Sequence, residues 1–315
     1  MIEDKPMTKA SIIITTHNRP HLLPRAVESA RTAGSDVEII VVDDASTDET
    51  AEVCKHLAGI NYVRAEHNQQ VAGARNAGVV ASHGEYLSFL DDDDTRLADS
   101  LDRQIELIDK APKAGLIYGQ AIVESEGKAK NVYPRECPQG DIFWDLLSRN
   151  FIPCGSVVFR RACLARVGLL DDRIPGLDDW DLWVRISEVC PIIATATPVT
   201  IWRRSTPVSG QGTSDSARLV SACVRRFRDV WMNLPRAASA PRKTRRAVWQ
   251  RFSENMAEHL IWESARALRH GETGQPLRNL SILPRLHALA LWRIAEHRVF
   301  RIPRARPSES PAFFG

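Results

Sequence analysis

Short apolar runs alternate with helical patterns over the first hundred residues of this 315-residue chain. The runs have the length of strands and span residues 11–15, 37–42, 61–65 and 86–90. Between them, apolar residues recur at spacings of three and four, as in helices. Near-continuous apolar runs indicate strands that are covered on both faces. Strands that alternate with helices predict an α/β fold, a Rossmann-like, mainly parallel sheet flanked by helices with right-handed crossovers.

The helix expected over 46–57 has a start signal of its own. Ser46 and Glu49 have the spacing of a capping box, in which the two side chains bond each other's backbone N–H groups. Beyond residue 99 the pattern becomes mixed. Helices are expected near 101–108, 143–147 and 160–164, strands near 116–118, 154–159 and 199–204, and an amphipathic helix with an acidic start from residue 178.

The same pattern divides the chain into three regions. Residues 1–210 are expected to form the α/β domain, with halves at about 9–98 and 99–210. Residues 211–303 are expected to form a C-terminal helical extension, with helices near 216–233, 243–270 and 284–299. Residues 304–315 are rich in Pro, Arg and Ser and are expected to be disordered.

Charge is distributed unevenly, although the net charge is only +3. Residues 1–202 hold 21 Lys and Arg against 31 Asp and Glu, whereas residues 203–315 hold 21 against 8. A basic tail suggests an anionic partner, either a membrane surface or nucleic acid. The tail lacks a nucleic-acid recognition motif, so we do not expect nucleic acid to be the partner. The alternative is an Arg-covered helical face docked on the acidic domain.

Several features indicate a cytoplasmic protein. The first residues lack the pattern of a signal peptide, and no segment approaches the roughly 18–20 apolar residues of a membrane span. The six cysteines are scattered and contain no Cys-x-x-Cys pair, so we expect reduced core thiols. The expected location is cytoplasmic, or peripheral on the inner face of the membrane if the basic tail binds lipid.

Polar residues follow three of the predicted strands. Thr15 and Thr16 end the first, Asp43 and Asp44 end the second, and four consecutive aspartates, 91–94, end the fourth. In open α/β sheets, ligands bind beyond the carboxyl ends of the strands, so these side chains are expected to line one site. Four adjacent carboxylates repel one another, which makes a divalent cation the natural partner. No glycine-rich dinucleotide or Walker motif accompanies them.

Five segments together resemble family 2 glycosyltransferases of the GT-A fold. They are residues 11–19 (SIIITTHNR), 41–48 (VVDDASTD), 72–78 (AGARNAG), 84–94 (GEYLSFLDDDD) and 177–183 (LDDWDLW). The second is similar to the family's V-D-D-x-S-x-D signature, and the fourth contains its D-x-D metal motif. The resemblance covers about residues 9–205. It implies that 9–98 is the nucleotide-sugar half and 99–210 the acceptor half.

The resemblance implies a nucleoside-diphosphate sugar donor and a bound Mn²⁺ or Mg²⁺. Such an ion stabilises the departing diphosphate as a Lewis acid and takes oxygen ligands. Asp93 would be the metal ligand, and Asp91 would face the metal or the ribose. Asp94 is expected to cap the following helix. Arg75 would face the diphosphate or pair with an aspartate. The other residues expected to contact the donor are Thr15, Asn18, Arg19, Asp44 and Asp92.

The acceptor side of the resemblance supplies a general base. Asp179 takes that role by its position in the motif, which implies direct displacement with inversion at the anomeric carbon. Asp178 stands where the family usually has Glu, whose side chain is one methylene longer. Trp180 would contact the acceptor, as part of a platform with Trp183, or belong to the core. Arg204 is the further residue expected on the acceptor side.

The acceptor itself is left open between two chemistries. A hydroxyl of a glycan, a lipid-linked glycan or a small molecule needs a base. A polyprenyl phosphate is already anionic and would not need Asp179. A non-catalytic nucleotide-sugar-binding protein is the alternative of another class, and it predicts loss of the carboxylates, whereas Asp44, Asp91, Asp93 and Asp179 are all present.

Overall fold

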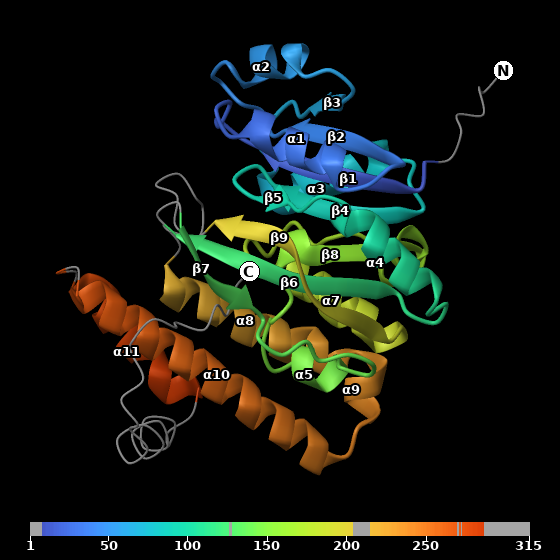
Figure 1. Ribbon diagram of the computed structural model, residues 1–315. Helices are drawn as coiled ribbons and strands as arrows, with labels where there is room; N and C mark the ends of the chain where they lie inside the picture. Colours follow the sequence, from blue (N-terminus) through green and yellow to red (C-terminus); the bar gives the residue numbers. More distant parts are fainter. Residues whose placement is uncertain (1–7, 126–127, 204–214, 270, 272, 287–315) are drawn as a thin grey trace. The chain divides into compact units, whose positions relative to one another are not determined.

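The computed structural model describes residues 8–125, 128–203, 215–269, 271 and 273–286 (Figure 1). The chain divides into two compact units. The first comprises Met1–Ile142 and Ile152–Gly212, and the second comprises Phe143–Phe151 and Thr213–Gly315. The membership of Phe143–Phe151 in the second unit has no counterpart in the sequence-based division.

The first unit is built on one sheet whose strand order is β3-β2-β1-β4-β8-β6-β9-β5, with β7 beside β6. Strands β3, β2, β1 and β4 are parallel to one another. Strand β8 is antiparallel to both β4 and β6, and β6 and β9 are parallel. The strands are β1 (Ala10–Thr16), β2 (Val37–Asp43), β3 (Asn61–Arg64), β4 (Tyr86–Asp91), β5 (Thr95–Arg96), β6 (Leu116–Ser125), β7 (Lys128–Tyr133), β8 (Val157–Arg160) and β9 (Ile192–Arg203).

The helices of this unit alternate with the first four strands, as the periodicity predicts. They are α1 (Leu23–Thr32), α2 (Thr50–His56), α3 (Gln70–Ala81), α4 (Ser100–Asp109), α6 (Leu164–Val167) and α7 (Asp178–Val189), with short 3₁₀ turns η1 (Cys154–Ser156) and η2 (Arg161–Cys163). The strand expected over 154–159 is therefore a turn followed by β8. The strand expected from residue 199 begins earlier, at Ile192.

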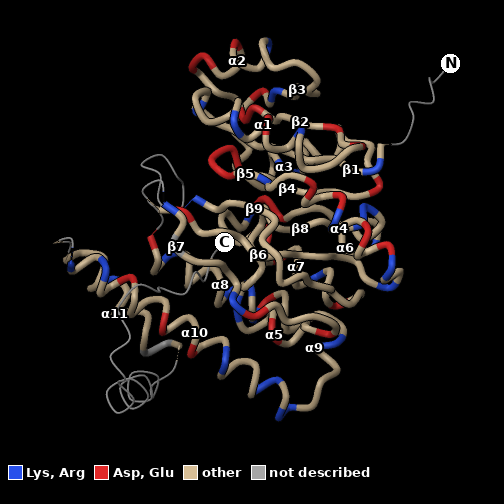
Figure 2. Tube along the Cα trace, in the orientation of Figure 1, with Lys and Arg blue, Asp and Glu red and all other residues tan. Residues whose placement is uncertain are grey.

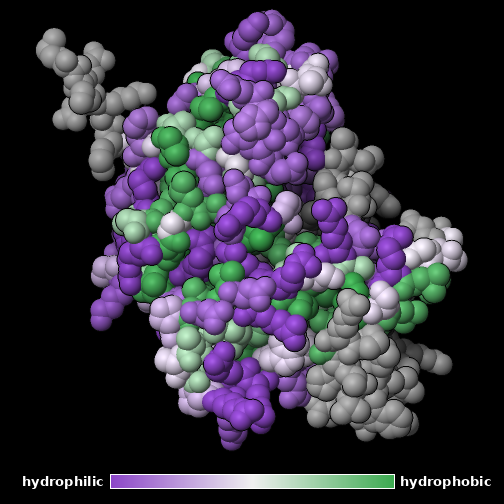
Figure 3. Space-filling model, turned by 180° about the vertical axis from the view of Figure 1, so that it is seen from behind, coloured by the Kyte–Doolittle hydropathy of each residue, from purple (hydrophilic) through white to green (hydrophobic). Residues whose placement is uncertain are grey.

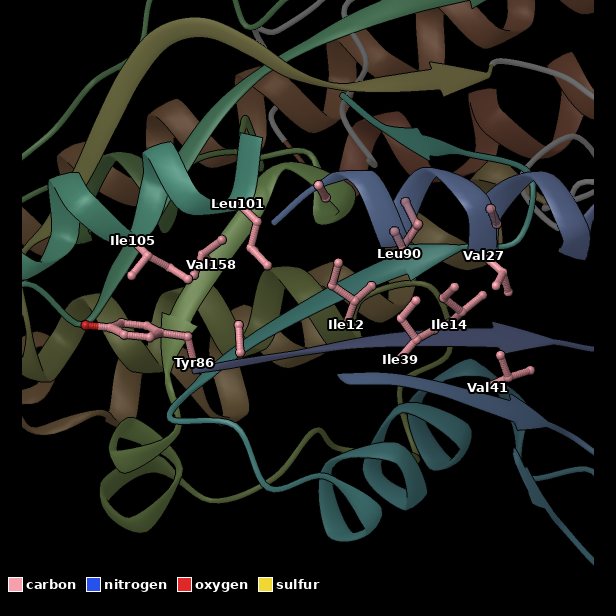
Figure 4. Close-up of a cluster of buried hydrophobic side chains, with 14 of the residues drawn as sticks. Ile12, Ile14, Val27, Ile39, Val41, Tyr86, Leu90, Leu101, Ile105 and Val158 are labelled. Carbon is pink, nitrogen blue, oxygen red and sulfur yellow. The ribbon is translucent and has the colours of Figure 1, made fainter. Parts of the chain in front are cut away.

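One face of the sheet carries a large apolar cluster beneath α1 and α4 (Figure 4). Ile12, Ile14 and Leu90 project from the strands toward Val27 of α1 and Leu101 of α4, and all are almost completely buried. Successive strand side chains point to opposite faces, so Ile13 projects to the other side. The alternation lets one strand contribute to two cores and leaves its polar end residues at the sheet's edge.

The opposite face is covered closely by α3, and Gly78 is what allows the approach. A Cβ added at Gly78 would lie 2.3 Å from Cγ2 of Ile13 and 3.1 Å from Cγ2 of Val42. Only a glycine fits between this helix and strands β1 and β2. The close packing has a consequence for the site, because Arg75 lies one turn before Gly78 on the same helix.

The capping-box prediction at Ser46 is wrong. Helix α2 begins at Thr50, and its N-cap residue, Glu49, makes no side-chain cap bond. The hydroxyl of Ser46 instead accepts the backbone N–H of Asn18 at 2.9 Å, and Asp48 accepts the N–H of Thr50 at 3.0 Å. A tertiary contact between the loops after β1 and β2 therefore takes the hydroxyl that the local pattern assigns to the helix.

The second unit is helical: α5 (Phe143–Leu146), α8 (Ser216–Asp229), α9 (Pro235–Ser239), α10 (Arg242–Arg269) and α11 (Gly274–Leu286), with η4 (Trp231–Asn233). Phe227 of α8 stacks on Phe252 of α10 at 4.4 Å between ring centroids. The guanidinium of Arg236 lies over the ring of Phe143, which explains why α5 belongs to this unit. The helix expected at 284–299 and the tail 304–315 fall almost wholly outside the described residues.

Basic residues recur along α10 and α11 (Figure 2). On the face shown in Figure 3, apolar residues are interspersed with hydrophilic ones. Among the residues that the structure describes, no helix combines the length and the apolar character that crossing a membrane requires.

The packing of α3 on the sheet generates a stability prediction. Gly78→Ala should lower the free energy of unfolding by about 1–3 kcal/mol, because an added methyl overpacks the contact with Ile13. The matched control is Gly274→Ala in α11, where the nearest atom to an added Cβ is a flexible Arg278 nitrogen at 3.5 Å. Urea unfolding measures both. Equal midpoints for Gly78→Ala and the wild type would contradict the packing argument.

Candidate functional site

The carboxyl ends of β1, β2 and β4 lie side by side. Thr16 is the register partner of Asp43 across β1 and β2, and Thr15 is the partner of Asp91 across β1 and β4. The expectation that these residues meet at one edge of the sheet is confirmed. Residues more than seventy positions apart in sequence therefore share one site because parallel strands end at a common edge.

The two aspartates after β2 have different surroundings. Asp43 is fully buried and accepts hydrogen bonds from Tyr62 at 2.7 Å and Arg64 at 2.6 Å. Asp44 accepts the backbone N–H of Gln69 at 2.7 Å. Burial raises the pKa of Asp44 despite that bond. Asp43 thus holds the local structure together, whereas Asp44 retains carboxylate capacity for a ligand.

Asn18 joins the loops after β1 and β2. Its backbone has φ of 56°, in the left-handed region that Asn tolerates better than most residues. In this conformation its side-chain oxygen accepts the backbone N–H of Thr47 at 2.8 Å, while its own N–H is bound by Ser46. Asn18 therefore fixes the entrance to the site next to Thr15 and Asp44.

The four consecutive aspartates separate into two groups. Carboxylate oxygens of Asp91, Asp93 and Asp94 all lie within 4.8 Å of one another. Asp92 points elsewhere and accepts bonds from Thr16 at 2.7 Å and from Arg19 at 2.9 Å. Asp92 therefore ties the loop after β1 to the loop after β4, and the other three carboxylates form the cluster.

Burial and mutual repulsion raise the pKa values of carboxyl groups in the cluster. Burial, and then the charges of Asp91 and Asp92, raise the pKa of Asp93 to about 6. Burial and the charge of Asp93 hold the pKa of Asp94 well above its usual range. Carboxylate oxygens are the ligands that hard divalent cations prefer, and a bound cation would remove this repulsion. The donor set therefore fits Mg²⁺ or Mn²⁺.

The expectation that Asp94 caps the following helix is wrong. Helix α4 has Asp99 as its N-cap residue, and Asp94 is buried, accepting the backbone N–H of Arg203 at 2.8 Å. The bond joins β9 to the loop after β4 across more than a hundred residues. The local motif contains no information about a partner so far away in sequence.

Three arginines outside the predicted site residues bind the segments that carry the carboxylate cluster. Arg25 of α1 and Arg203 of β9 donate to the main-chain carbonyl of Asp93 at 2.9 and 3.1 Å. Arg96 is fully buried and donates to Ser88 and to the carbonyl of Gly155; burial lowers its pKa to about 9. The sequences around Arg25 and Arg96 match no motif, so no local pattern identifies these two arginines.

Arg75 connects the two halves of the unit. Its guanidinium donates to Asp91 at 2.8 Å and to Asp178, at the start of α7, also at 2.8 Å. Of the two alternatives for Arg75, pairing with an aspartate is the one observed. The carboxylate of Asp178 is only 2% exposed, and this pair occupies it. The three aspartates in the first turn of α7 are therefore buried rather than exposed to solvent.

Asp179 lies next to this ion pair and is buried as well, with 4% of its surface exposed. One carboxylate oxygen accepts the backbone N–H of Trp180 at 2.5 Å. The other, Oδ2, has no hydrogen-bond partner within the described part of the chain. Burial and the charge of Asp178 raise the pKa of Asp179 to about 7. A carboxyl group with these properties can take up or release a proton near neutral pH.

The remaining residues predicted for the acceptor side are Trp180, its neighbour Trp183, and Arg204. Trp180 and Trp183 are fully buried, as the core alternative predicts. Trp183 packs edge-on against Phe159, with ring centroids 5.8 Å apart. Arg204 lies outside the described residues.

Comparison with known proteins identifies a family. Residues 11–167, about half of the chain, match the model described as Glycosyl transferase family 2. An uncharacterised glycosyltransferase of Haemophilus influenzae is 27% identical over 179 residues, which cover 56% of this chain and 61% of that protein. The Escherichia coli protein WfaP, a UDP-Glc:alpha-D-GlcNAc-diphosphoundecaprenol beta-1,3-glucosyltransferase, is 28% identical over 185 residues, covering 57% and 70%. The chain spans 59% and 34% of the length of two other curated relatives, uncharacterised glycosyltransferases of Nostoc and Rickettsia conorii.

Solved structures share the fold over nearly the whole chain. Staphylococcus aureus TarS 1–349 in complex with UDP superposes with a TM-score of 0.55 at 15% identity, covering 95% of both chains. Mannosyltransferase PcManGT from Pyrobaculum calidifontis in complex with GDP-Man and Mn²⁺ gives 0.54 at 17% identity, covering 91% and 88%. The predicted GT-A type fold is confirmed. The match to the family model establishes that this chain belongs to glycosyl transferase family 2.

Proposed function

We propose that the protein transfers a sugar from a nucleoside-diphosphate sugar to a hydroxyl of a lipid-linked glycan, with inversion at the anomeric carbon. The observation that carries the proposal is Asp179: a lone base with a pKa of about 7, connected through the Asp178–Arg75–Asp91 ion pairs to the carboxylate cluster. The names of relatives support the lipid-linked acceptor, since WfaP is a transferase to a diphosphoundecaprenol-linked sugar.

The donor would bind at the common edge of β1, β2 and β4. In this proposal Asp44 accepts a hydrogen bond from the nucleotide base, with Thr15 and Asn18 beside it. Asp91, Asp93 and Asp94 would hold Mn²⁺ or Mg²⁺, which supplies Lewis-acid stabilisation of the diphosphate leaving group. Arg19, whose Nη1 lies 3.7 Å from Oδ2 of Asp93, is placed to add positive charge toward the same group.

Asp179 would perform the proton transfer. Its carboxylate accepts the proton of the acceptor hydroxyl as the oxygen attacks the anomeric carbon, and the nucleoside diphosphate leaves from the opposite face. A single displacement of this kind forms no covalent sugar–enzyme bond and inverts the configuration. The backbone N–H of Trp180 orients the carboxylate, and Arg75 pairs with Asp178 beside it.

Two other acceptor assignments remain as alternatives. A polyprenyl phosphate acceptor would leave Asp179 without a proton to remove. Transfer to a small-molecule hydroxyl would use the same base without the lipid.

Removing one carboxylate tests the metal site. Asp93→Asn should lower Mn²⁺-dependent transfer about 10²-fold or more, since the leaving group loses its Lewis acid. The raised pKa of Asp93 means that the ionised form destabilises the fold, and stability falls as pH rises from about 4 to 6. In EDTA at pH 8, Asp93→Asn should therefore melt higher than the wild type, and it should not be stabilised by Mn²⁺ with UDP.

The control for this variant is Asp172→Asn, an exposed aspartate outside the cluster. It should match the wild type in transfer and in both melting experiments. Full Mn²⁺-dependent transfer by Asp93→Asn would remove Asp93 from the metal site.

The pH dependence of transfer tests the base. Because the base must be ionised and its pKa is raised to about 7, kcat should fall tenfold per pH unit below about 7 and level off above it. Asp179→Asn should lose this inflection and about 10²–10⁴-fold in transfer, while retaining donor binding. Asp181→Asn, on the same helical turn but paired with Arg185, should keep the inflection. Undiminished transfer by Asp179→Asn would favour a phosphate acceptor.

We also propose that the second unit binds an anionic membrane surface, where a lipid-linked acceptor resides. The first two turns of α10 hold four basic residues, Arg242, Lys243, Arg245 and Arg246, although the helix dipole disfavours cations there. An anion outside the protein, such as a lipid headgroup, would offset the unfavourable position of these cations at the helix N-terminus.

Co-sedimentation with vesicles of anionic and neutral lipid measures this binding. The full chain should bind anionic vesicles, more weakly as salt rises. Charge reversal at exposed Arg242, Lys243 and Arg246 should weaken binding about 10²-fold or more, whereas Lys55→Glu in the first unit should not. Binding that is equal for neutral vesicles, or insensitive to salt, would contradict an electrostatic membrane surface.

A further inference from the structure

Four buried side-chain polar atoms lack a hydrogen-bond partner within the described ranges, and three of them belong to one neighbourhood. They are Nε of Arg75, Oδ2 of Asp179 and Nε1 of Trp183; the fourth, Oδ1 of Asn279, is in the second unit. Buried donors and acceptors are nearly always paired in folded proteins. Three unpaired atoms around the proposed base therefore indicate a ligand.

A closed loop of contacts brings the three residues together. Arg75 binds Asp178, which precedes Asp179 on α7, and Trp183 follows Asp179 by one turn on the same helical face. On the other side, the Arg75 guanidinium lies 5.4 Å above the ring of Phe89. A chain of aromatic contacts, Phe89–Phe159 at 5.6 Å and Phe159–Trp183 at 5.8 Å, completes the loop.

The unpaired atoms also fit one another chemically. Arg75 Nε and Trp183 Nε1 each carry a hydrogen to donate, and the Oδ2 atom of an ionised Asp179 only accepts. The complementary ligand is an oxygen that accepts two hydrogen bonds and donates one. Water and an alcohol hydroxyl are the groups with this capacity.

We propose that Arg75, Asp179 and Trp183 bind one hydroxyl-type oxygen, supplied by a water molecule or by the acceptor, and that the Trp183 N–H positions it on Asp179. Trp183 is thus a positioning residue, a role that rests on the proposed function of Asp179. The bound oxygen itself does not depend on that function.

Trp183→Phe removes the N–H and keeps an aromatic ring in the core. Without this N–H, the oxygen that donates to the ionised Asp179 is held less firmly, so the pH midpoint of transfer should move up by about one unit. The other charged or titratable groups that face Asp179 are Asp178, Arg75, Asp91 and the Cys154 thiol. They are unchanged in this variant, so the shift reports the indole N–H. The control, Trp231→Phe, alters an equally buried tryptophan of the second unit and should leave the midpoint in place.

The two sources of the oxygen give different kinetics. If it is the acceptor hydroxyl, KM for the acceptor should also rise, roughly 3–10-fold for one lost neutral hydrogen bond. If it is water, KM for the acceptor should stay constant while the midpoint shifts. An active Trp183→Phe enzyme with neither change would overturn the positioning role.

A crystal structure of the wild-type protein, free and with acceptor, tests the oxygen independently of activity and of whether the variant folds. We expect density for one oxygen within hydrogen-bond distance of Nε1 of Trp183 and Oδ2 of Asp179. An empty space in both crystals would overturn the proposal even if Asp179 proves to be the base. An ordered oxygen in a protein whose Asp179→Asn variant transfers normally would instead refute only the base assignment.

Discussion

The two ion pairs of Arg75 are the interaction on which this site depends. One guanidinium binds Asp91 at the end of β4 and Asp178 at the start of α7, each at 2.8 Å. Without it, the buried carboxylate of Asp178 would face the partly exposed carboxylate of Asp91 uncompensated, and a buried charge that loses its partner is costly. Arg75 reaches this place because Gly78 lets α3 lie directly on β1 and β2. The packing of one helix thus sets the geometry of both carboxylate groups.

The site gathers more negative charge than its arginines compensate. Asp92 has Thr16 and Arg19 as partners, whereas burial and neighbouring charge raise the pKa values of Asp93, Asp94 and Asp179. Perturbed carboxylates of this kind cluster where proteins bind cations or move protons. In the proposed function the cluster at Asp93 receives a divalent ion, and Asp179 receives the proton of the acceptor. Burial destabilises the ionised carboxylates, and in the proposed function it thereby favours cation binding at Asp93 and proton uptake at Asp179.

Sequence patterns predicted the features that repeat locally. The strands and helices of the first half, the meeting of Thr15, Asp44 and Asp91 at one edge, and the fold class follow from hydrophobic period and parallel topology. The patterns misassigned Ser46 and Asp94, because a hydroxyl or carboxylate suited to a helix cap bonds a distant backbone N–H instead. They also missed Arg25 and Arg96, since such an arginine is identified by tertiary partners that no local pattern contains. The antiparallel insertion of β8 between β4 and β6 is non-local in the same way.

A double-mutant cycle between Arg75→Met and Asp178→Asn tests the central claim most directly, with kcat/KM for sugar transfer as the readout. If Arg75 joins the base helix to the carboxylate cluster through Asp178, either change breaks the same link. The double variant should then lose much less than the two single losses combined, with a coupling of at least about 1 kcal/mol. Strictly additive losses would contradict the account, because they would mean that Arg75 and Asp178 act on transfer independently.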